Sequence, residues 1–286
     1  MATLSPGYTG YLLYKGQPIR LSSGSVGVNQ EVLSEPTVFG LRDNRLGSGI
    51  LGGKFDGGPG VAQKTMHRPS VKDIRGNFSF PVTENSPMDD LFSDAATGED
   101  FSATFFFNCD VSTTVTEAKI STFTISCTQG EFVECSVDFA AKNLTTGAGY
   151  NFYTDAEKIC IWTNLSFSVG GLTNECADSI SFSIENPITP IYTSGTNVDN
   201  FLLPRDLRIG EQNIMGEINF YDIAPNDFDI TQALFGNNGN FSISIAPVLN
   251  SKSIPVRYHP VTTQNNLSAI SGAIAFTGVD YISTDF

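Results

Sequence analysis

The side chains that could do chemistry are scarce in this 286-residue sequence. Acidic residues cluster at positions 89–90, 99–100 and 227–229, and paired carboxylates are what a Ca²⁺ site or a glycosidase uses. These clusters lie in no D-x-[DN]-x-[DN]-G loop, and two of them fall in the first turn of a predicted short helix, where negative charge is favoured. We therefore interpret the clusters as structural and predict that the protein binds no metal ion.

The sequence offers equally little for nucleophilic or cofactor-dependent catalysis. Its two histidines, His67 and His259, lie far apart, and its cysteines form no C-x-x-C pair. The segment 47–52, GSGILG, fits G-x-G-x-x-G, but no buried strand precedes it and no helix follows it, so we interpret it as a loop. We predict a non-enzymatic protein without a cofactor. An odd number of cysteines favours a reducing compartment: Cys109, Cys127, Cys135, Cys160 and Cys176.

Composition narrows the class of protein further. Hydrophobic residues make up 40% of the chain and charged residues 16%, which is too apolar for a disordered chain and too sparsely charged for a helical bundle. The net charge of −14 is concentrated in residues 76–204, which hold 3 Lys/Arg against 17 Asp/Glu. Such a field repels nucleic acid and argues against a sequence-specific DNA-binding protein, but it allows a surface along which DNA slides. We expect neither a secretion signal nor a membrane helix.

Strict alternation of apolar and polar residues, as in 180–184 and 241–245, predicts strands with one buried and one solvated face. The clearest hairpin is 119–139, with its turn at Thr128–Glu131, where Gly130 supplies the permissive backbone. This turn predicts three cross-strand pairs on the buried face, namely Cys127 with Val133, Ile125 with Cys135 and Phe123 with Val137. The opposite face of the hairpin then carries a polar row: Thr122, Thr124, Ser126, Glu134, Ser136 and Asp138.

Two short helices are predicted, and they reveal an internal repeat. Ser86 precedes a proline at the start of the first helix, 87–96, and would cap it with its hydroxyl, whereas the second helix is predicted at 226–235. The segments 76–95 and 216–236 share one order, which is glycine, alternating strand, polar turn and short acidic helix. A period of this length indicates a duplicated domain.

We therefore predict an all-β protein with short helices, built as two tandem β-sandwich or barrel domains. The first domain would span residues 1–150 and the second residues 151–286, with the boundary in the stretch 142–155. Residues 41–66 stand apart from this pattern because they hold seven glycines and no alternation. We interpret them as a long functional loop of the first domain.

Residues 178–221 resemble a segment of phage tail tube proteins. In that family a strand ending in an Asn-Pro-like turn leads into leucine, proline, an acid, a small basic run and glycine, and then into a strand that opens Gly-x-(Ile/Val). The hairpin at 119–139 resembles the closing strands of the same fold. The matching positions are Phe182, Ile184, Asn186, Pro204, Asp206, Gly210, Gly216 and Ile218.

The resemblance implies a structural virion protein of the tail, assembled in the host cytoplasm together with other tail proteins. Its subunits would form homo-oligomeric rings, either trimers with six quasi-equivalent domains or hexamers, and the rings would stack into a tube that conducts genomic DNA. The polar row of the 119–139 hairpin would line an acidic lumen. The loop 41–66 would contact the adjacent ring through its apolar side chains: Leu46, Ile50, Leu51 and Phe55.

Other functions stay open at this point. The Gly-rich insertion would also suit a hub, adaptor or baseplate protein of the same fold. A capsid-decorating or adhesin-like pair of β-sandwiches that binds a partner without forming a tube is an alternative from another class, and a glycan-processing enzyme is a third. Rings or filaments would favour the tail tube, whereas isolated monomers would favour the binding module.

Overall fold

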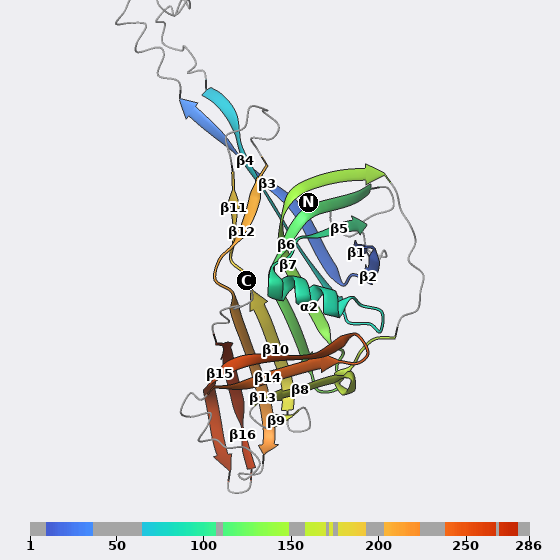
Figure 1. The fold of residues 1–286 in the computed structure, drawn as a ribbon, viewed down its shortest axis with the longest axis vertical. Helices are drawn as coiled ribbons and strands as arrows, with labels where there is room; N and C mark the ends of the chain where they lie inside the picture. The colour runs from blue at the N-terminus through green and yellow to red at the C-terminus, as the bar shows by residue number, and fades with distance from the viewer. Residues whose placement is uncertain are drawn as a thin grey trace, which may run out of the picture.

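The computed structural model describes residues 10–36, 65–106, 111–148, 158–169, 172–173, 177–192, 203–223, 238–266 and 269–279. Antiparallel strands dominate these residues, and the α-helix among them is α2 (Met88–Thr97) (Figure 1). The predicted all-β class is therefore confirmed.

The strands fall into two groups along the chain. The first group comprises β1 (Tyr11–Tyr14), β2 (Gln17–Arg20), β3 (Ser23–Pro36), β4 (Thr65–Pro81), β5 (Phe101–Phe106), β6 (Val111–Thr128) and β7 (Glu134–Ala148). After the 3₁₀ turn η1 (Trp162–Asn164), the second group comprises β8 (Leu165–Val169), β9 (Leu172–Thr173), β10 (Ala177–Glu185), β11 (Ile188–Ile191), β12 (Asp206–Ile209), β13 (Asn213–Ile223), β14 (Asn238–Ile245), β15 (Leu249–Asn266) and β16 (Ala269–Gly278).

The two groups pair their strands in the same order. In the first group the order is β3-β4-β7-β6-β5-β1-β2, and in the second it is β10-β13-β16-β15-β14-β8-β9. The hairpin β11·β12 is a separate insertion between β10 and β13. The second predicted helix, 226–235, lies outside the described residues, so its position cannot be compared with that of α2. Duplication of the domain stays a prediction, although the equal strand order is what it requires.

One strand joins the two groups into a single sheet. β6 pairs with β7 along one edge, whereas its other edge pairs first with β5 and then, from Thr122 to Thr128, with β10. We call this β6·β10 contact the in-chain joint. Buried side chains of both groups form one continuous hydrophobic core, which extends across the in-chain joint.

Each group folds back on itself so that aromatic rings meet across the core. Phe105 of β5 stacks on Phe139 of β7 with ring centroids 5.6 Å apart. Phe241 of β14 packs in the same way on Phe276 of β16, at 4.5 Å, and on Phe182 of β10, at 5.1 Å. In Figure 1 β14 accordingly crosses over β10 and β13. Such aromatic pairs add stability beyond their buried area.

A glycine makes room for one of these rings in each group. A Cβ atom added at Gly76 would lie 2.4 Å from Cζ of Phe139, which is its cross-strand partner in β7. A Cβ atom added at Gly216 would lie 2.1 Å from Cζ of Phe276, its partner in β16. The aromatic ring covers the glycine in both places, a device that fixes strand register. The two contacts also mark equivalent positions in the two groups.

The predicted 119–139 hairpin is confirmed in its strands, its turn and two of its three predicted cross-strand pairs. Ile125 pairs with Cys135 and Phe123 with Val137, and the turn contains Gly130 at φ 85°. The third predicted pair differs, because Val133 turns away from the hairpin. Its N–H donates to the carbonyl of Cys160 and its carbonyl accepts from Val82.

The first predicted helix is confirmed, but its predicted cap is wrong. The residue at the N-cap of α2 is Pro87, and no side chain caps the helix there. The hydroxyl of Ser86 instead accepts a hydrogen bond from the N–H of Thr83, at 2.9 Å, because the preceding turn brings that donor closer. The helix ends at Gly98, whose φ of 70° allows the left-handed cap.

Candidate functional site

A continuous polar face runs along one side of the sheet, opposite the core. It spans an eight-strand run with the order β3-β4-β7-β6-β10-β13-β16-β15, and its residues follow from the period of two along each strand. All six residues of the polar row predicted from the hairpin lie on it, half-buried or exposed. One cross-strand row shows its composition: Ser23, Ser79, Ser136, Thr124 and Ser183.

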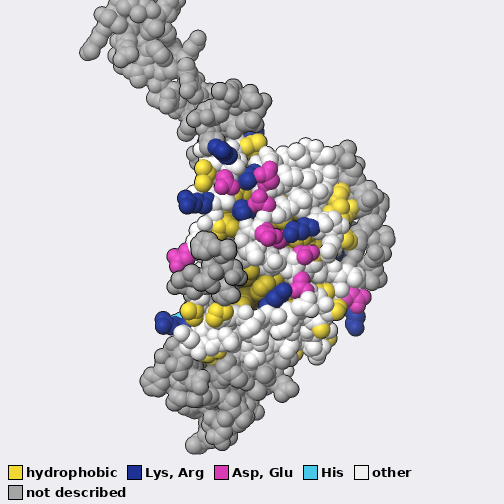
Figure 2. Space-filling model, viewed as in Figure 1, with side chains coloured by type: hydrophobic (Ala, Val, Ile, Leu, Met, Phe, Trp, Pro, Cys, Tyr) yellow, Lys and Arg dark blue, Asp and Glu magenta, His cyan; other side chains and the backbone are white. Residues whose placement is uncertain are grey.

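The charges on the polar face are mostly negative. Its carboxylates come from both groups of strands: Glu134, Asp138, Glu185 and Glu217. Partial burial raises the pKa of Asp138 above the ordinary value for aspartate. On the same strands, Arg75 pairs with Asp73 at 2.8 Å, and Arg257 is exposed on β15. In the view of Figure 2, by comparison, basic and acidic side chains are interspersed without separation by sign.

A shallow depression of about 330 Å³ lies on the polar face where β6, β10 and β13 meet. Ser126, Glu134, Ser181 and Glu217 contribute to its lining, which offers hydroxyls and carboxylates but no cation. Within the described ranges no three His, Cys, Asp or Glu side chains come together in a way that could hold a metal ion. The depression therefore offers no positively charged side chain that could bind a phosphate group.

The core side of the in-chain joint is covered by α2. Phe92 of the helix stacks on Phe182 of β10 with centroids 6.1 Å apart and meets Phe123 of β6 edge-on at 5.9 Å. The ring of Phe92 therefore packs against both strands of the in-chain joint. The helix therefore stabilises the pairing between the two groups of strands as well as its own group.

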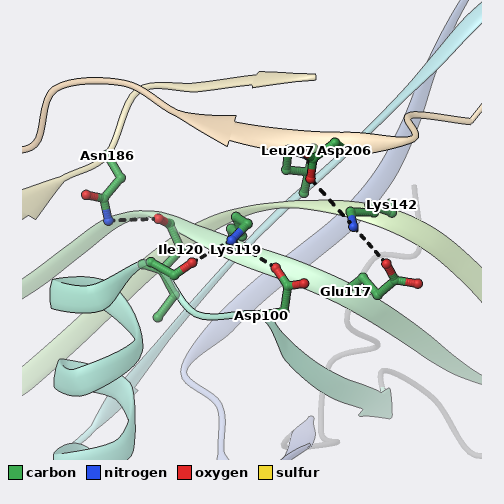
Figure 3. A network of polar contacts seen from close by, with 9 residues as sticks. Asp100, Glu117, Lys119, Ile120, Lys142, Asn186, Asp206 and Leu207 are labelled. Carbon is green, nitrogen blue, oxygen red and sulfur yellow. Dashed lines mark hydrogen bonds and ion pairs between the residues drawn. The ribbon is translucent and has the colours of Figure 1, made fainter. Parts of the chain in front are cut away.

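Asn186 closes one end of the in-chain joint (Figure 3). It is 1% exposed, and its side-chain amide donates to the carbonyls of Ala95 at 2.8 Å and Ile120 at 3.1 Å. Its side-chain oxygen accepts from Gln212 at 2.9 Å. One side-chain amide from the second group of strands thus provides hydrogen-bond donors for a carbonyl at the C-terminal end of α2 and for a carbonyl at a bulge in β6. Both carbonyls belong to the first group.

Lysines add polar contacts beside this amide (Figure 3). Lys119 donates to the carbonyl of Gly98 at 2.6 Å and pairs with Asp100 at 3.0 Å. Lys142 pairs with Glu117 at 2.8 Å and lies 3.7 Å from Asp206 at the start of β12. The hairpin β11·β12 also packs Ile188 and Leu207 on Ala140 of β7: these three residues form a second, small apolar cluster.

Several of the positions that carried the family resemblance lie on or beside the in-chain joint. Phe182 and Ile184 are core residues of β10, and Asn186 is the closing amide. Gly210 donates its N–H to the carbonyl of Pro187 at 2.8 Å and so closes the base of the β11·β12 hairpin. Gly216 faces Phe276. Gln212, Lys119 and Lys142 were not predicted, because an isolated polar residue in a loop or strand gives no periodic signal.

Other predicted residues cannot be placed. Residues 41–64 of the predicted loop 41–66 lie outside the described residues, and with them Leu46, Ile50, Leu51 and Phe55. Thr65 and Met66 of that loop instead belong to β4. Cys109 and Cys176 also lie outside the described residues. Cys127, Cys135 and Cys160 are buried free thiols. Burial raises the pKa of the Cys127 thiol to about 11, and it raises the pKa of Cys135 and Cys160 as well. Burial and the raised pKa values both favour the protonated form of these thiols at neutral pH.

Comparison with known proteins supports the family resemblance seen in the sequence. None of the described helices has the length and apolarity needed to cross a membrane. The search of curated proteins found no match. The family model described as phage tail tube protein matches residues 23–280, which run from the first residue of β3 to beyond the end of β16. The chain belongs to the phage tail tube protein family and is a structural protein of the phage tail, and hence a component of the virion.

Proposed function

We propose that the protein forms closed rings that stack into a tail tube, with the polar face turned toward a lumen that conducts DNA. The observation that carries this proposal is the continuity of the polar face across strands of both groups, opposite one shared core. A one-sided sheet with open ends must have its edges paired or covered, and closure into a ring does this. The hydroxyls and carboxylates of the polar face would then present DNA with no cation to hold its phosphates.

The subunit is, in this proposal, a duplicated protein with domains 1–150 and 151–286. The equal strand order and the paired Gly–Phe contacts support this division. A ring built from such subunits needs half as many chains as domains. Trimers with six quasi-equivalent domains are thus the simplest arrangement, and hexamers are the alternative. Other tail proteins would bind at the ends of the stack.

The lumen assignment is tested by reversing charge on the polar face. The double substitution Glu134→Lys and Asp138→Lys should leave the fold intact, because Asp138 is exposed and Glu134 is half-exposed. It should slow DNA release from assembled particles at low salt and much less at high salt, since new phosphate contacts weaken steeply as salt rises. Genome release would be followed at low and high ionic strength.

A matched control reverses two acidic residues away from the polar face. Glu84 and Glu99 are exposed in the turns that flank α2, and replacing both by lysine changes the net charge equally. This control should release DNA at the wild-type rate. Equal release by both double variants at every salt concentration would refute the lumen assignment and leave the ring proposal intact.

Contact between rings is proposed for the loop 41–66. An apolar trio, Phe132, Ile159 and Ile161, is exposed by 49%, 44% and 47% beyond the end of the sheet where Pro81 pairs with Glu134. The loop emerges from the other end, where Pro36 pairs with Thr65. The loop of one ring would therefore face the trio of the next, and its apolar side chains Leu46, Ile50, Leu51 and Phe55 suit that surface.

Deleting residues 44–62 should abolish tube growth and leave soluble, folded subunits. The substitution Phe132→Ser should also reduce tube growth, because it removes the most exposed side chain of the trio. Electron microscopy of the assembled protein would count tubes, and circular dichroism would check the fold. Tubes of normal length from the deletion variant would exclude the loop as the contact between rings.

A further inference from the structure

A largely apolar groove of about 500 Å³ lies between α2 and the second group of strands. Phe92 of the helix and Ile184 of β10 line it and belong to the hydrophobic core, whereas Ile214 and Ile254 line it and are only partly buried against that core. The groove is therefore a place where the hydrophobic core stays open to solvent. The other lining residues are Ala96, Thr97, Gln212, Ser253, Pro255 and Val279.

An unused strand edge runs along the groove. β16 lies between β13 and β15 and ends at Gly278, which pairs with Val256. β15 begins earlier, at Leu249, and there pairs with β14 on its other edge. Among the described strands, nothing pairs with residues 250–254 on the edge where β16 stops. The backbone of β15 can therefore accept an added strand at this edge.

The chain enters the groove at Val279. The N–H of Val279 donates to the carbonyl of Pro255 at 3.1 Å, which continues the β15·β16 ladder by one residue. The side chain of Val279 lines the groove and is 37% exposed. The chain is thus directed along the unused edge in the register of β16, and the next residue in that register lies opposite Ile254.

We propose that residues 280–283 occupy this groove as an extension of β16, paired antiparallel with residues 251–254 of β15. The register of β16 carries over directly: Asp280 lies opposite Ile254, Tyr281 opposite Ser253 and Ile282 opposite Lys252. The segment would fasten α2, which belongs to the first group of strands, to β15 of the second. This inference concerns the single subunit and does not depend on the ring.

The apolar side chain of the segment falls where the groove needs it. Phe276 of β16 is buried in the core, so the period of two along the strand directs Ile282 to the same side and Tyr281 to the opposite side. Lys252, opposite Ile282, carries its ammonium group 5.7 Å from the ring centre of Phe92. Ile282 would therefore lie beside this ring and cover the part of the core that the groove leaves open.

The polar end of the groove suits the residue before it. Thr277 of β16 pairs with Met215, so the same register places Asp280 beside Gln212, which precedes β13. Gln212 and Thr97 supply an amide and a hydroxyl to the lining at that end. The carboxylate of Asp280 would thus meet polar groups, and only Ile282 would need an apolar surface.

The occupant is this chain's own segment and not a second copy. Val279 is covalently joined to residue 280, so the segment is held at the groove at a high effective concentration that a separate molecule must exceed. Its length also fits. Four extended residues span about 13 Å, which is comparable to the length of about 15 Å of the ten-residue helix α2 beside the groove.

A designed disulfide tests the register in unassembled, full-length subunits. Ser253→Cys and Tyr281→Cys would lie directly opposite each other on the face away from the groove, with Cα atoms about 5.5 Å apart, which suits a disulfide. After mild oxidation, peptide mass mapping should find residues 253 and 281 linked within one chain in most molecules. Wild-type protein gives the background from the native cysteines.

Ser253→Cys with Ile282→Cys is the matched control. Residue 282 would point to the other face, so this pair should link at least about 10-fold less than the first. Equal linkage of the two pairs, or no linkage of either, would overturn the proposal. Linkage of residues 253 and 281 between two chains would also overturn it, because the groove would then take a second copy.

The contact of Ile282 with the groove has a separate test. Ile282→Asp should lower the midpoint of thermal unfolding by at least about 2–4 °C, because it places an unpaired charge against apolar side chains. Ser283→Asp adds the same charge on the solvated face and should leave the midpoint within about 1 °C of the wild type. Equal midpoints for the two variants would overturn the proposed position of Ile282.

Discussion

The substitution Asp94→Ala is expected to lower the free energy of unfolding by about 1–3 kcal/mol, because it leaves the buried hydroxyl of Tyr14 without its acceptor. Asp94 lies in α2 and is 1% exposed. It accepts a hydrogen bond from the hydroxyl of Tyr14 and pairs with Lys15 at 2.7 Å. Burial and this hydrogen bond raise the pKa of Tyr14, so the phenol stays protonated and donates. Urea unfolding followed by the fluorescence of Trp162 would measure the change.

Glu99→Ala is the control for Asp94. Glu99 is exposed just after the same helix, and its replacement should change the free energy of unfolding by less than about 0.5 kcal/mol. Asp94→Asn should fall between the two variants, because an amide oxygen can still accept from Tyr14 but cannot form the ion pair. Equal losses for Asp94→Ala and Glu99→Ala would show that the buried contact does not stabilise the fold.

The second large effect is expected from filling the space under the paired aromatic rings. Gly76→Ala and Gly216→Ala should each destabilise the protein by about 1–3 kcal/mol through overpacking. Gly76→Ala should cost more, because its Cβ would also lie 2.6 Å from the backbone oxygen of Ser25, which cannot move aside as a ring can. Thermal or urea unfolding would rank the two variants.

Two further variants make this comparison specific. Gly27→Ala should be tolerated, since a Cβ there has no atom within 4 Å. Combining Gly216→Ala with Phe276→Leu should recover part of the stability lost by the glycine variant alone, because the smaller side chain vacates the space. If Gly27→Ala destabilised the protein as much as Gly216→Ala, loss of glycine itself and not contact with the ring would be the cause.

The local structure could be predicted from the sequence because its signals are local. Alternation assigned Phe123, Ile125 and Cys135 to the core, and all three are buried there. Gly130 marked the turn because few other residues adopt its positive φ. The prediction that Ser86 caps the helix was wrong, because the cap depends on the path of the preceding turn. The sequence does not show that this turn brings the N–H of Thr83 to the Ser86 hydroxyl.

The pairing between the two groups of strands could not be predicted in this way. No pattern in Thr122–Thr128 indicates that β10, far along the chain, pairs there, because a strand with one polar and one apolar face accepts many partners. The importance of Asn186 came only from the resemblance, and its contacts with Ala95 and Ile120 needed the fold. Alternation likewise identifies a polar face but not whether it faces a lumen or the outside.

Electron cryomicroscopy of the purified, assembled protein would test the central claim most directly. The account predicts hollow rings or tubes in which Glu134 and Asp138 lie on the inner wall. Particles that stay monomeric under assembly conditions, or tubes with Glu134 and Asp138 on the outer wall, would contradict it.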